Sequence, residues 1–186
     1  LASSAASDVY KRQLQRLSGL VEQILSMGME RRKTFRLHPE EINLKELITP
    51  LMEQHQLKAD KPVHIELDIQ PETLVIVADR THFSNIISNL IDNAVKYSKE
   101  EAELSISCRQ TGGTVTVSVT DRGIGIPLDK QKHIFDKFYR VPTGNLHNIK
   151  GYGLGLFYVK SMVEKHGGTI TVKSEPDKGS TFTITL

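Results

Sequence analysis

The sequence predicts an α+β fold, a two-layer sandwich in which helices cover one face of a mixed sheet, preceded by a long N-terminal helix. Two observations predict it. Strand patterns of period two occur as hairpins beside amphipathic helices, rather than in strict strand–helix alternation. The chain has 186 residues, a length that suits one compact domain with an attached helix.

Composition argues against several classes of function. The net charge is only +2, there is no Trp, and basic residues are not interleaved with aromatics, so a nucleic-acid partner is not expected. The seven histidines show no metal-ligand spacing, so zinc is not expected either. A single cysteine, Cys108, excludes an internal disulfide and fits a reducing compartment. It alternates with Leu104 and Ile106, which predicts a buried thiol.

No apolar run approaches the ~18–20 residues that span a bilayer, and no signal peptide is visible. This piece is therefore expected to be soluble, while a longer parent protein could still be anchored in a membrane.

The first predicted element is a helix that ends near Lys33. Its apolar residues follow a/d spacing with one addition: Leu14, Leu17, Val21, Ile24 and Leu25. So narrow a stripe commonly packs on another helix, which favours half of a helical hairpin or a dimer seam. The alternative is a helix that caps the domain core.

A second helix is predicted to begin at Asn43, a good N-cap, after an extended link through residues 37–39. Its apolar face comprises Leu44, Leu47, Ile48 and Leu51. Two short strands are then predicted near residues 63–69 and 74–77, with a turn at 70–72 between them.

Asp79 is expected to cap a third helix that runs to about Tyr97. A hairpin over residues 104–119 follows, with its turn at Gly112-Gly113. About thirty residues of little regular pattern come next, and long loops in compact domains often act as lids. The last predicted elements are a helix over 154–166 and two strands around the turn at 176–179.

The third helix carries an unusual row of amides. One face is apolar, and an adjoining arc of about 120° holds Asn85, Asn89, Asn93, Lys96 and Tyr97. Asparagine is a mediocre helix former because its side chain competes for backbone hydrogen bonds. The row is either a solvated polar face or a set of ligands for a bound polar group. In the second case Asn93 could give a carbonyl oxygen to Mg²⁺, and Lys96 could contact a phosphate.

Two glycine clusters flank the predicted lid. In the first, Asp121 ends a strand and precedes Gly123 and Gly125, where the backbone can approach a ligand closely. A carboxylate there can accept a hydrogen bond from the N6 amine of adenine and disfavours guanine. Taken alone, this pattern is a weak signal and favours an ordinary turn.

The second cluster, residues 151–156, opens a helix whose N–H groups and dipole favour phosphate. It is neither a Walker A loop nor a Rossmann fingerprint. Between the clusters, Phe135 and Phe138 are expected to pack the lid onto the body. The basic residues there are expected to be mostly solvated, with Arg140 or Lys150 the best candidates for contacting a triphosphate.

Four segments in register resemble the histidine-kinase ATPase family, which is shared with gyrase-type, mismatch-repair and heat-shock chaperone ATPases. Residues 89–98 resemble its N box, 121–127 its G1 box, 135–140 its F box and 151–156 its G2 box. Each motif is weak alone, but their order and spacing make the joint match specific. The similarity covers roughly residues 40–186.

This resemblance implies a Bergerat-type sandwich that holds ATP·Mg²⁺ between the amide helix and the lid. It implies catalytic roles for Asn89, Asn93 and Lys96, with Asn93 as the metal ligand and Asn89 supporting the metal–phosphate region. Lys96 and Tyr97 would contact phosphate or sugar, and Asp121 would recognise adenine. The remaining residues expected to bind the cofactor are Gly123, Gly125, Ile126, Arg140, Lys150, Gly151, Tyr152, Gly153, Leu154, Gly155 and Leu156.

The same resemblance implies that residues 1–34 are the second helix of a dimerisation and phosphoacceptor hairpin and that 35–186 are the catalytic domain. The family transfers the ATP γ-phosphoryl group to a histidine on the dimerisation domain, for onward transfer to a response-regulator receiver domain. A homodimer and a cytoplasmic position in an inner-membrane sensor protein are also implied.

One feature departs from the family pattern. Its acceptor histidine is usually followed by Glu or Asp, whereas none of the seven histidines here is. The fragment is therefore predicted to bind ATP without labelling itself. Two rival functions stay open: an ATP-hydrolysing conformational clamp, and a nucleotide-binding or dimerisation module without chemistry. Clamp relatives place a Glu one turn before the metal-binding Asn, where this chain has Asn89, which cannot activate water as a base.

Overall fold

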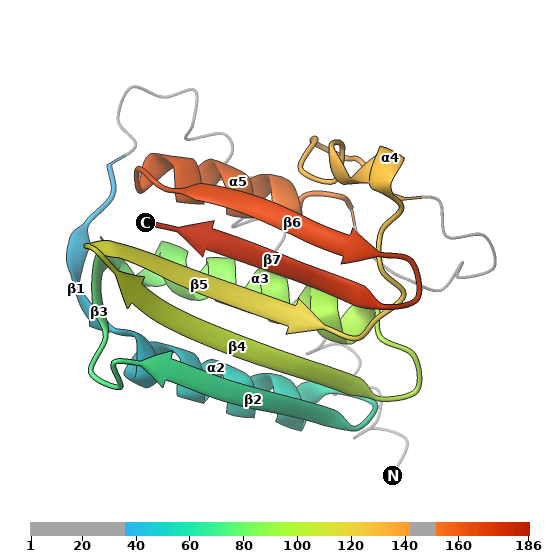
Figure 1. Cartoon of the computed structure of the whole chain (residues 1–186), viewed down its shortest axis with the longest axis horizontal. Coiled ribbons are helices and arrows are strands. Elements are labelled where there is room, and N and C mark those ends of the chain that lie inside the picture. Colours follow the sequence, from blue (N-terminus) through green and yellow to red (C-terminus); the bar gives the residue numbers. More distant parts are fainter. Residues whose placement is uncertain (1–35, 142–151) are drawn as a thin grey trace, which may run out of the picture. The chain divides into compact units, whose positions relative to one another are not determined.

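A five-stranded sheet organises the part of the chain that the computed structural model describes, residues 36–141 and 152–186. Its strand order is β2 (Val63–Gln70), β4 (Ala102–Thr111), β5 (Thr114–Asp121), β7 (Gly179–Thr185) and β6 (Thr169–Glu175). β2 pairs with β4 in parallel and all other pairs are antiparallel, so the predicted mixed sheet is confirmed (Figure 1).

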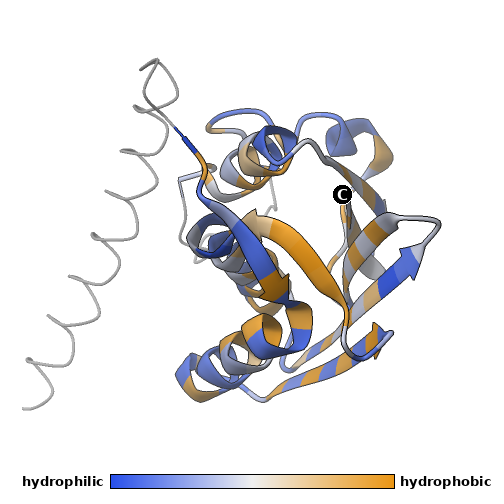
Figure 2. Cartoon of the chain, turned by 90° about the vertical axis from the view of Figure 1, so that its left-hand side faces the viewer, coloured by the Kyte–Doolittle hydropathy of each residue, from blue (hydrophilic) through white to orange (hydrophobic). Residues whose placement is uncertain are grey.

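Three helices cover one face of this sheet: α2 (Leu44–Lys58), α3 (Arg80–Lys96) and α5 (Gly155–Lys165). Figure 2 shows the two layers edge-on, with colours that alternate along the strands. Alternate residues of β4 and β5 are buried. A short helix, α4 (Leu128–Gln131), lies beside the sheet. The predicted α+β sandwich is therefore confirmed, whereas the long N-terminal helix predicted before it lies outside the described residues.

Both predicted helix caps are present. Asn43 Oδ1 accepts hydrogen bonds from the N–H groups of Lys45 and Glu46, and Asp79 Oδ1 accepts one from that of His82. These bonds satisfy N–H groups that a helix start otherwise leaves unpaired. The predicted apolar stripe of α3 is buried throughout: Phe83, Ile86, Ile87, Leu90, Ile91 and Ala94.

A two-stranded sheet was not expected from the sequence. Residues Pro39–Asn43 form β1, which pairs antiparallel with β3 (Val75–Asp79), although residues 37–39 were expected to be only a link. β1 is hard to recognise because it is short, begins with proline and buries only Ile42 fully. Pairing β3 with β1 places Asp79 at the start of α3.

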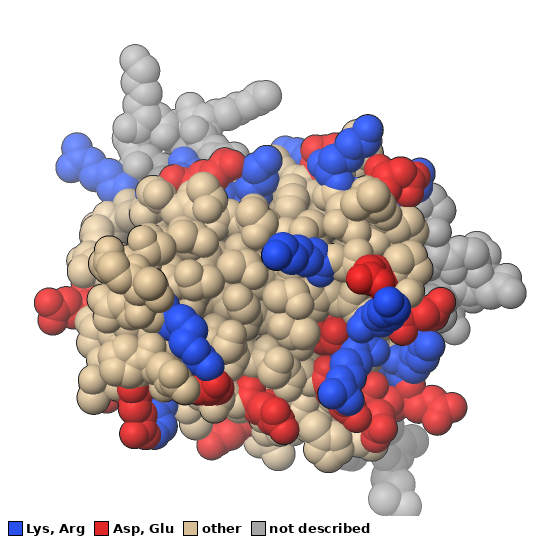
Figure 3. Space-filling model, in the orientation of Figure 1, with Lys and Arg blue, Asp and Glu red and all other residues tan. Residues whose placement is uncertain are grey.

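The other face of the five-stranded sheet is rich in hydroxyl groups. Ser118 pairs with Thr183 at 3.1 Å, and Thr120 with Thr181 at 3.0 Å, across β5 and β7. Figure 3 shows that charged side chains lie mostly toward the rim of this face. None of the helices in the described ranges has the length and apolar character needed to cross a lipid bilayer.

Candidate functional site

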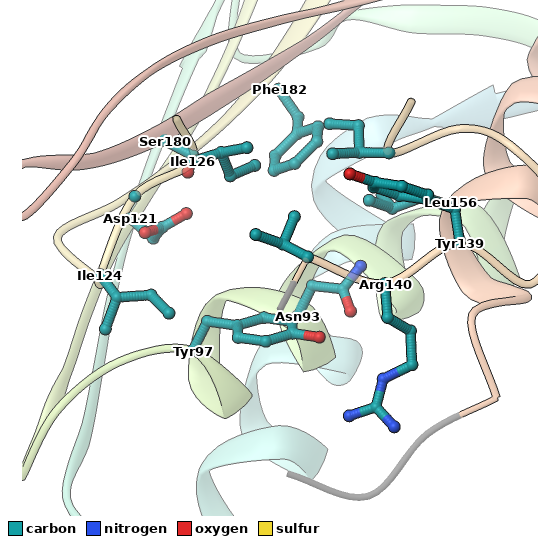
Figure 4. Close-up of a pocket in the computed structure, with 13 residues that line it drawn as sticks. Asn93, Tyr97, Asp121, Ile124, Ile126, Tyr139, Arg140, Leu156, Ser180 and Phe182 are labelled. Atoms are coloured by element: carbon teal, nitrogen blue, oxygen red, sulfur yellow. The ribbon is translucent and has the colours of Figure 1, made fainter. Parts of the chain in front are cut away.

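A pocket opens where the C-terminal end of α3, the end of β5 and the segment after α4 meet (Figure 4). Several predicted site residues line it: Asn93, Tyr97, Asp121, Gly125, Ile126, Arg140 and Leu156. Its wall also includes residues that were not among the predicted site residues: Ile124 and Tyr139, which lie within the matched motifs, and Ile134, Val141, Ser180 and Phe182. The two sequence-distant motifs around Asn93 and Asp121 therefore meet in one cavity.

Asp121 is the buried acidic group of this pocket, with 8% of its surface exposed. Burial raises the pKa of its carboxyl, and backbone N–H donors from Gly123 and Ser180 oppose that rise. The Gly123 N–H lies 2.8 Å from Asp121 Oδ1. These donors orient the carboxylate as a hydrogen-bond acceptor at the wall of the pocket.

Close backbone contacts fix the loop after Asp121. A Cβ on Gly123 would lie 2.7 Å from the carbonyl oxygen of Tyr97, and the Ile124 N–H donates to that same oxygen at 3.0 Å. Gly125 has φ +67°, and a Cβ there would lie 1.9 Å from the carbonyl oxygen of Glu175. Only glycine fits such an approach, so the loop is held between the end of α3 and the end of β6.

The predicted amide row divides between two places. Asn93 lines the pocket. One turn earlier, Asn89 donates from Nδ2 to the carbonyl oxygen of Asn85 at 2.7 Å, and its Oδ1 would lie 2.8 Å from a Cβ on Gly155. Asn89 therefore abuts the first residue of α5, beyond the pocket wall.

Basic side chains gather at the end of α3. Burial lowers the pKa of Lys96, as does the nearby Arg140, whereas Asp92 opposes the change. The Lys96 ammonium lies 5.0 Å from the centre of the Tyr97 ring, and burial raises the pKa of that phenol. Arg140 lines the pocket and Lys96 lies beside it, so this end of the site attracts anions.

The second glycine cluster contributes mainly to the frame of the site. Gly153 has φ +71°, and a Cβ there would lie 2.7 Å from the carbonyl carbon of Phe138. Leu154 is buried just before α5, and Tyr152 is 66% exposed. Of this cluster only Leu156 reaches the pocket wall, while Lys150 and Gly151 lie outside the described residues.

The expectation that both lid phenylalanines pack onto the body is wrong for one of them. Phe135 packs edge-on against Phe182, with ring centres 6.4 Å apart. Phe138 is 64% exposed. Its backbone takes the left-handed φ of +66° and its N–H donates to the Gly153 carbonyl oxygen at 2.9 Å. This backbone contact holds the residue at the base of the lid and leaves its ring in solvent.

Strand pairing explains why Ser180 and Phe182 were missed. β7 lies beside β5, with Ser180 opposite Asp121 and Phe182 opposite Val119. A period-two pattern could have placed Phe182 on an inward face, but the neighbour of β7 is set by tertiary pairing that no local signal in the sequence reveals.

The fold and the pocket together are those of an α+β sandwich domain with a site suited to a nucleotide: a buried carboxylate at one end, and the Asn93 amide with nearby cations at the other. The family model described as "Histidine kinase-, DNA gyrase B-, and HSP90-like ATPase" matches residues 78–186. The chain belongs to this family and contains the catalytic ATPase domain of a two-component sensor histidine kinase.

Three relatives illustrate the match. The sensor protein RprX of Bacteroides fragilis is 42% identical over 183 residues, covering 97% of this chain and 35% of that protein. The mycobacterial sensor histidine kinase MprB has a solved structure that matches with a TM-score of 0.69 and 26% identity, covering 80% of this chain and 97% of that one.

The histidine kinase ThkA, crystallised in complex with the response regulator protein TrrA, matches with a TM-score of 0.71 and 27% identity. The match covers 95% of this chain and 48% of that one. The chain spans between 35% and 48% of the length of the curated relatives it matches.

Proposed function

We propose that this domain binds ATP·Mg²⁺ in the pocket and transfers the γ-phosphoryl group to a histidine of the dimerisation domain. The observation that carries the proposal is that Asp121 and Asn93, from distant motifs, line one cavity beside Arg140 and Lys96. The cavity thus has a hydrogen-bond acceptor for a nucleobase at one end and cations for phosphates at the other.

The adenine end rests on Asp121. Its carboxylate is held by the Gly123 and Ser180 N–H groups and has acceptor capacity left for the N6 amine of adenine. Ile124 and Ile126 supply apolar surface at the same wall. Guanine would present an O6 acceptor to the carboxylate, so ATP is expected to bind in preference to GTP.

The phosphate end rests on the end of α3. The carboxamide oxygen of Asn93 is a hard neutral ligand of the kind Mg²⁺ accepts when phosphates supply the negative charge, so the donors present fit the ion. When bound, Mg²⁺ neutralises charge on the phosphate oxygens. Lys96 and Arg140 add positive charge near the same position. Asn89, one turn before Asn93, would support the metal–phosphate region from its place against Gly155.

The reaction needs positioning more than covalent help from the protein. The bond between the γ-phosphorus and the β–γ bridging oxygen breaks while a neutral imidazole nitrogen bonds to the γ-phosphorus, and ADP leaves. Asn89 occupies the place where clamp ATPases carry a glutamate, and an amide cannot act as a base toward water. This feature favours phosphoryl transfer over hydrolysis.

The partners follow from the same proposal. Residues 1–34 would be the second helix of the dimerisation hairpin, and 35–186 the catalytic domain. The acceptor histidine would come from a preceding helix of the same protein, which we propose acts as a homodimer in the cytoplasm beneath an inner-membrane sensor. A receiver domain would accept the phosphoryl group, as suggested by the relative ThkA, which was crystallised with a response regulator protein.

Labelling with γ-³²P-ATP tests the proposed transfer. The chain alone should take up no label, because none of its histidines has the acceptor pattern. Adding a separate acceptor hairpin should give Mg²⁺-dependent label on that hairpin. Strong label on the chain alone, or release of inorganic phosphate without label on the hairpin, would contradict the proposal and favour self-labelling or the clamp function.

Two substitutions separate binding from transfer. Asp121→Asn replaces the acceptor carboxylate and should weaken ATP binding at least tenfold in calorimetry, a loss of about 1.4 kcal/mol or more. Asn93→Asp should retain adenosine binding but abolish Mg²⁺-dependent transfer, because it alters the charge and donor set at the proposed metal position. Unchanged transfer in Asn93→Asp would remove the metal assignment, and ATP binding without any transfer in the native chain would leave a non-catalytic module.

A further inference from the structure

Helix α2 carries a histidine on the face that packs inward. His55 follows Ile48 by seven residues and Leu44 by eleven, and both of those side chains are fully buried. The spacing places His55 on the same helical stripe. Its side chain is 10% exposed. A polar ring at a core position needs partners, and α3 provides them.

The imidazole bridges one turn of α3. His55 Nδ1 lies 3.0 Å from Asp92 Oδ1, and Nε2 lies 2.8 Å from Ser88 Oγ. Since an ionised carboxylate can only accept, Nδ1 carries the proton. The serine hydroxyl can donate to Nε2 when that nitrogen is unprotonated and accept from it when it is protonated. Ser88 and Asp92 are four residues apart, so one rigid ring contacts the same face of α3 at two successive turns.

Each contacted residue directly precedes a member of the amide row: Ser88 precedes Asn89, and Asp92 precedes Asn93. Adjacent residues in a helix differ by ~100° and ~1.5 Å, so the contacted row and the amide row turn and slide together. Fixing Ser88 and Asp92 therefore fixes the direction in which Asn89 and Asn93 point.

The contact also influences Lys96. Asp92 lies one turn before Lys96, and its carboxylate favours the charged form of that lysine. The side chain of Asp92 is 69% exposed. A carboxylate at this spacing can pair with the lysine. By accepting from His55, Asp92 is drawn toward α2, which leaves the ammonium available for an anion.

We propose that His55 is a positioning residue that sets the rotation of α3, so that Asn89, Asn93 and Lys96 face the metal–phosphate end of a bound nucleotide. This inference rests on the proposed function. It requires that loss of His55 weakens recognition of the phosphates while adenine recognition by Asp121, which belongs to β5, stays intact.

Calorimetry with two probes tests it: a non-hydrolysable ATP analogue with Mg²⁺, and adenosine alone. His55→Leu removes both polar contacts at similar side-chain volume and should weaken the Mg²⁺-bound analogue about tenfold, while adenosine affinity stays within about twofold. His55→Gln can donate and accept at similar reach and should restore most of the affinity. Gln54→Ala, an exposed neighbour on α2, is the matched control and should bind like the native chain.

Equal losses for both probes would overturn the proposal, because they are expected if His55 has a purely structural role. No loss for either probe would also overturn it, because that is expected if His55 has no role in binding. If His55→Leu does not fold, Ser88→Ala takes its place and should weaken only the Mg²⁺-bound analogue, by about threefold. A native chain that binds neither probe would instead refute the proposed function, and the positioning role would fall with it.

Discussion

At the scale of single residues, the site depends on places where a side chain cannot fit. Gly125 combines φ +67° with a backbone oxygen 1.9 Å from where its Cβ would lie, whereas Gly113, at the Gly112-Gly113 turn, has φ +86° and open space around it. Left-handed backbone costs a non-glycine residue about 1–2 kcal/mol at either position. Only Gly125 adds a collision with backbone that cannot move aside.

Comparing Gly125→Ala with Gly113→Ala separates these two effects. Gly113→Ala should lower the free energy of unfolding by about 1 kcal/mol and leave ATP affinity unchanged. Gly125→Ala should cost more than about 2 kcal/mol in urea unfolding and should abolish ATP binding, because the loop that carries Ile124 and Ile126 must shift. Equal effects of the two substitutions would mean that the loop is not clamped between α3 and β6.

How well the sequence predicted the site depends on how local each signal is. Asn93 and Asp121 were predicted because each is part of a motif on one segment, and the structure brings both to one pocket. Ser180 enters the site only through the pairing of β7 with β5. Phe138 was misjudged because its exposure follows from a left-handed backbone held by Gly153, which hydrophobicity does not encode.

At the scale of elements, Asp79 joins three parts of the fold. Its Oδ1 caps α3 through His82, and its Oδ2 accepts from the His38 N–H just before β1. Its own N–H donates to His166 Nε2, which follows α5. His166 Nδ1 lies 2.7 Å from the Met162 carbonyl oxygen, an acceptor only, so this ring is held as the Nδ1–H tautomer. These hydrogen bonds of Asp79 with His38, His82 and His166, called the Asp79 node below, connect the starts of β1 and α3 with the end of α5.

This node should make stability depend on acidity. Burial by itself would raise the pKa of Asp79, but the His38 and His82 N–H donors and the nearby His82 and His166 rings together outweigh it, so the folded-state pKa lies below the ordinary value. Such a group contributes stability that is present above the unfolded pKa of ~3.9 and is lost as pH falls through the folded value.

Asp79→Ala should therefore lower the free energy of unfolding by about 1–2 kcal/mol at pH 7. In urea titrations the difference from the native chain should be fully present at pH 7 and should shrink below about pH 4. A difference that stayed constant down to pH 3 would show that the carboxylate charge does not contribute. Lys45→Ala, whose partner Glu72 is on the surface, serves as an exposed ion-pair control and should leave stability close to that of the native chain.

Elements with strong periodicity were predicted well, and those without it were not. The core stripe of α3 and the β4–β5 hairpin match the predicted residues because 3.6-residue and two-residue periods are visible in any short window. β1 shows no such period, and its partner β3 lies more than thirty residues away, so pairing had to come from the tertiary fold.

At the scale of the whole molecule, one helix links the fold to the chemistry. α3 packs its apolar face on the sheet, begins at the Asp79 node and ends at the pocket, with its amides on an adjoining face. Between Asp79 and Asn93 it spans roughly 20 Å. A metal bound with the nucleotide is therefore expected near the end of this helix and far from its start.

Replacing Mg²⁺ by paramagnetic Mn²⁺ measures that location directly. In ¹⁵N-labelled chain with ATP, Mn²⁺ should broaden the side-chain amide signals of Asn89 and Asn93 beyond detection. The side-chain amide of Asn43, which caps α2 and pairs with Val75 outside the pocket lining, should remain visible. Sharp Asn89 and Asn93 signals in the presence of bound ATP·Mn²⁺, or broadening centred on Asn43, would contradict the account.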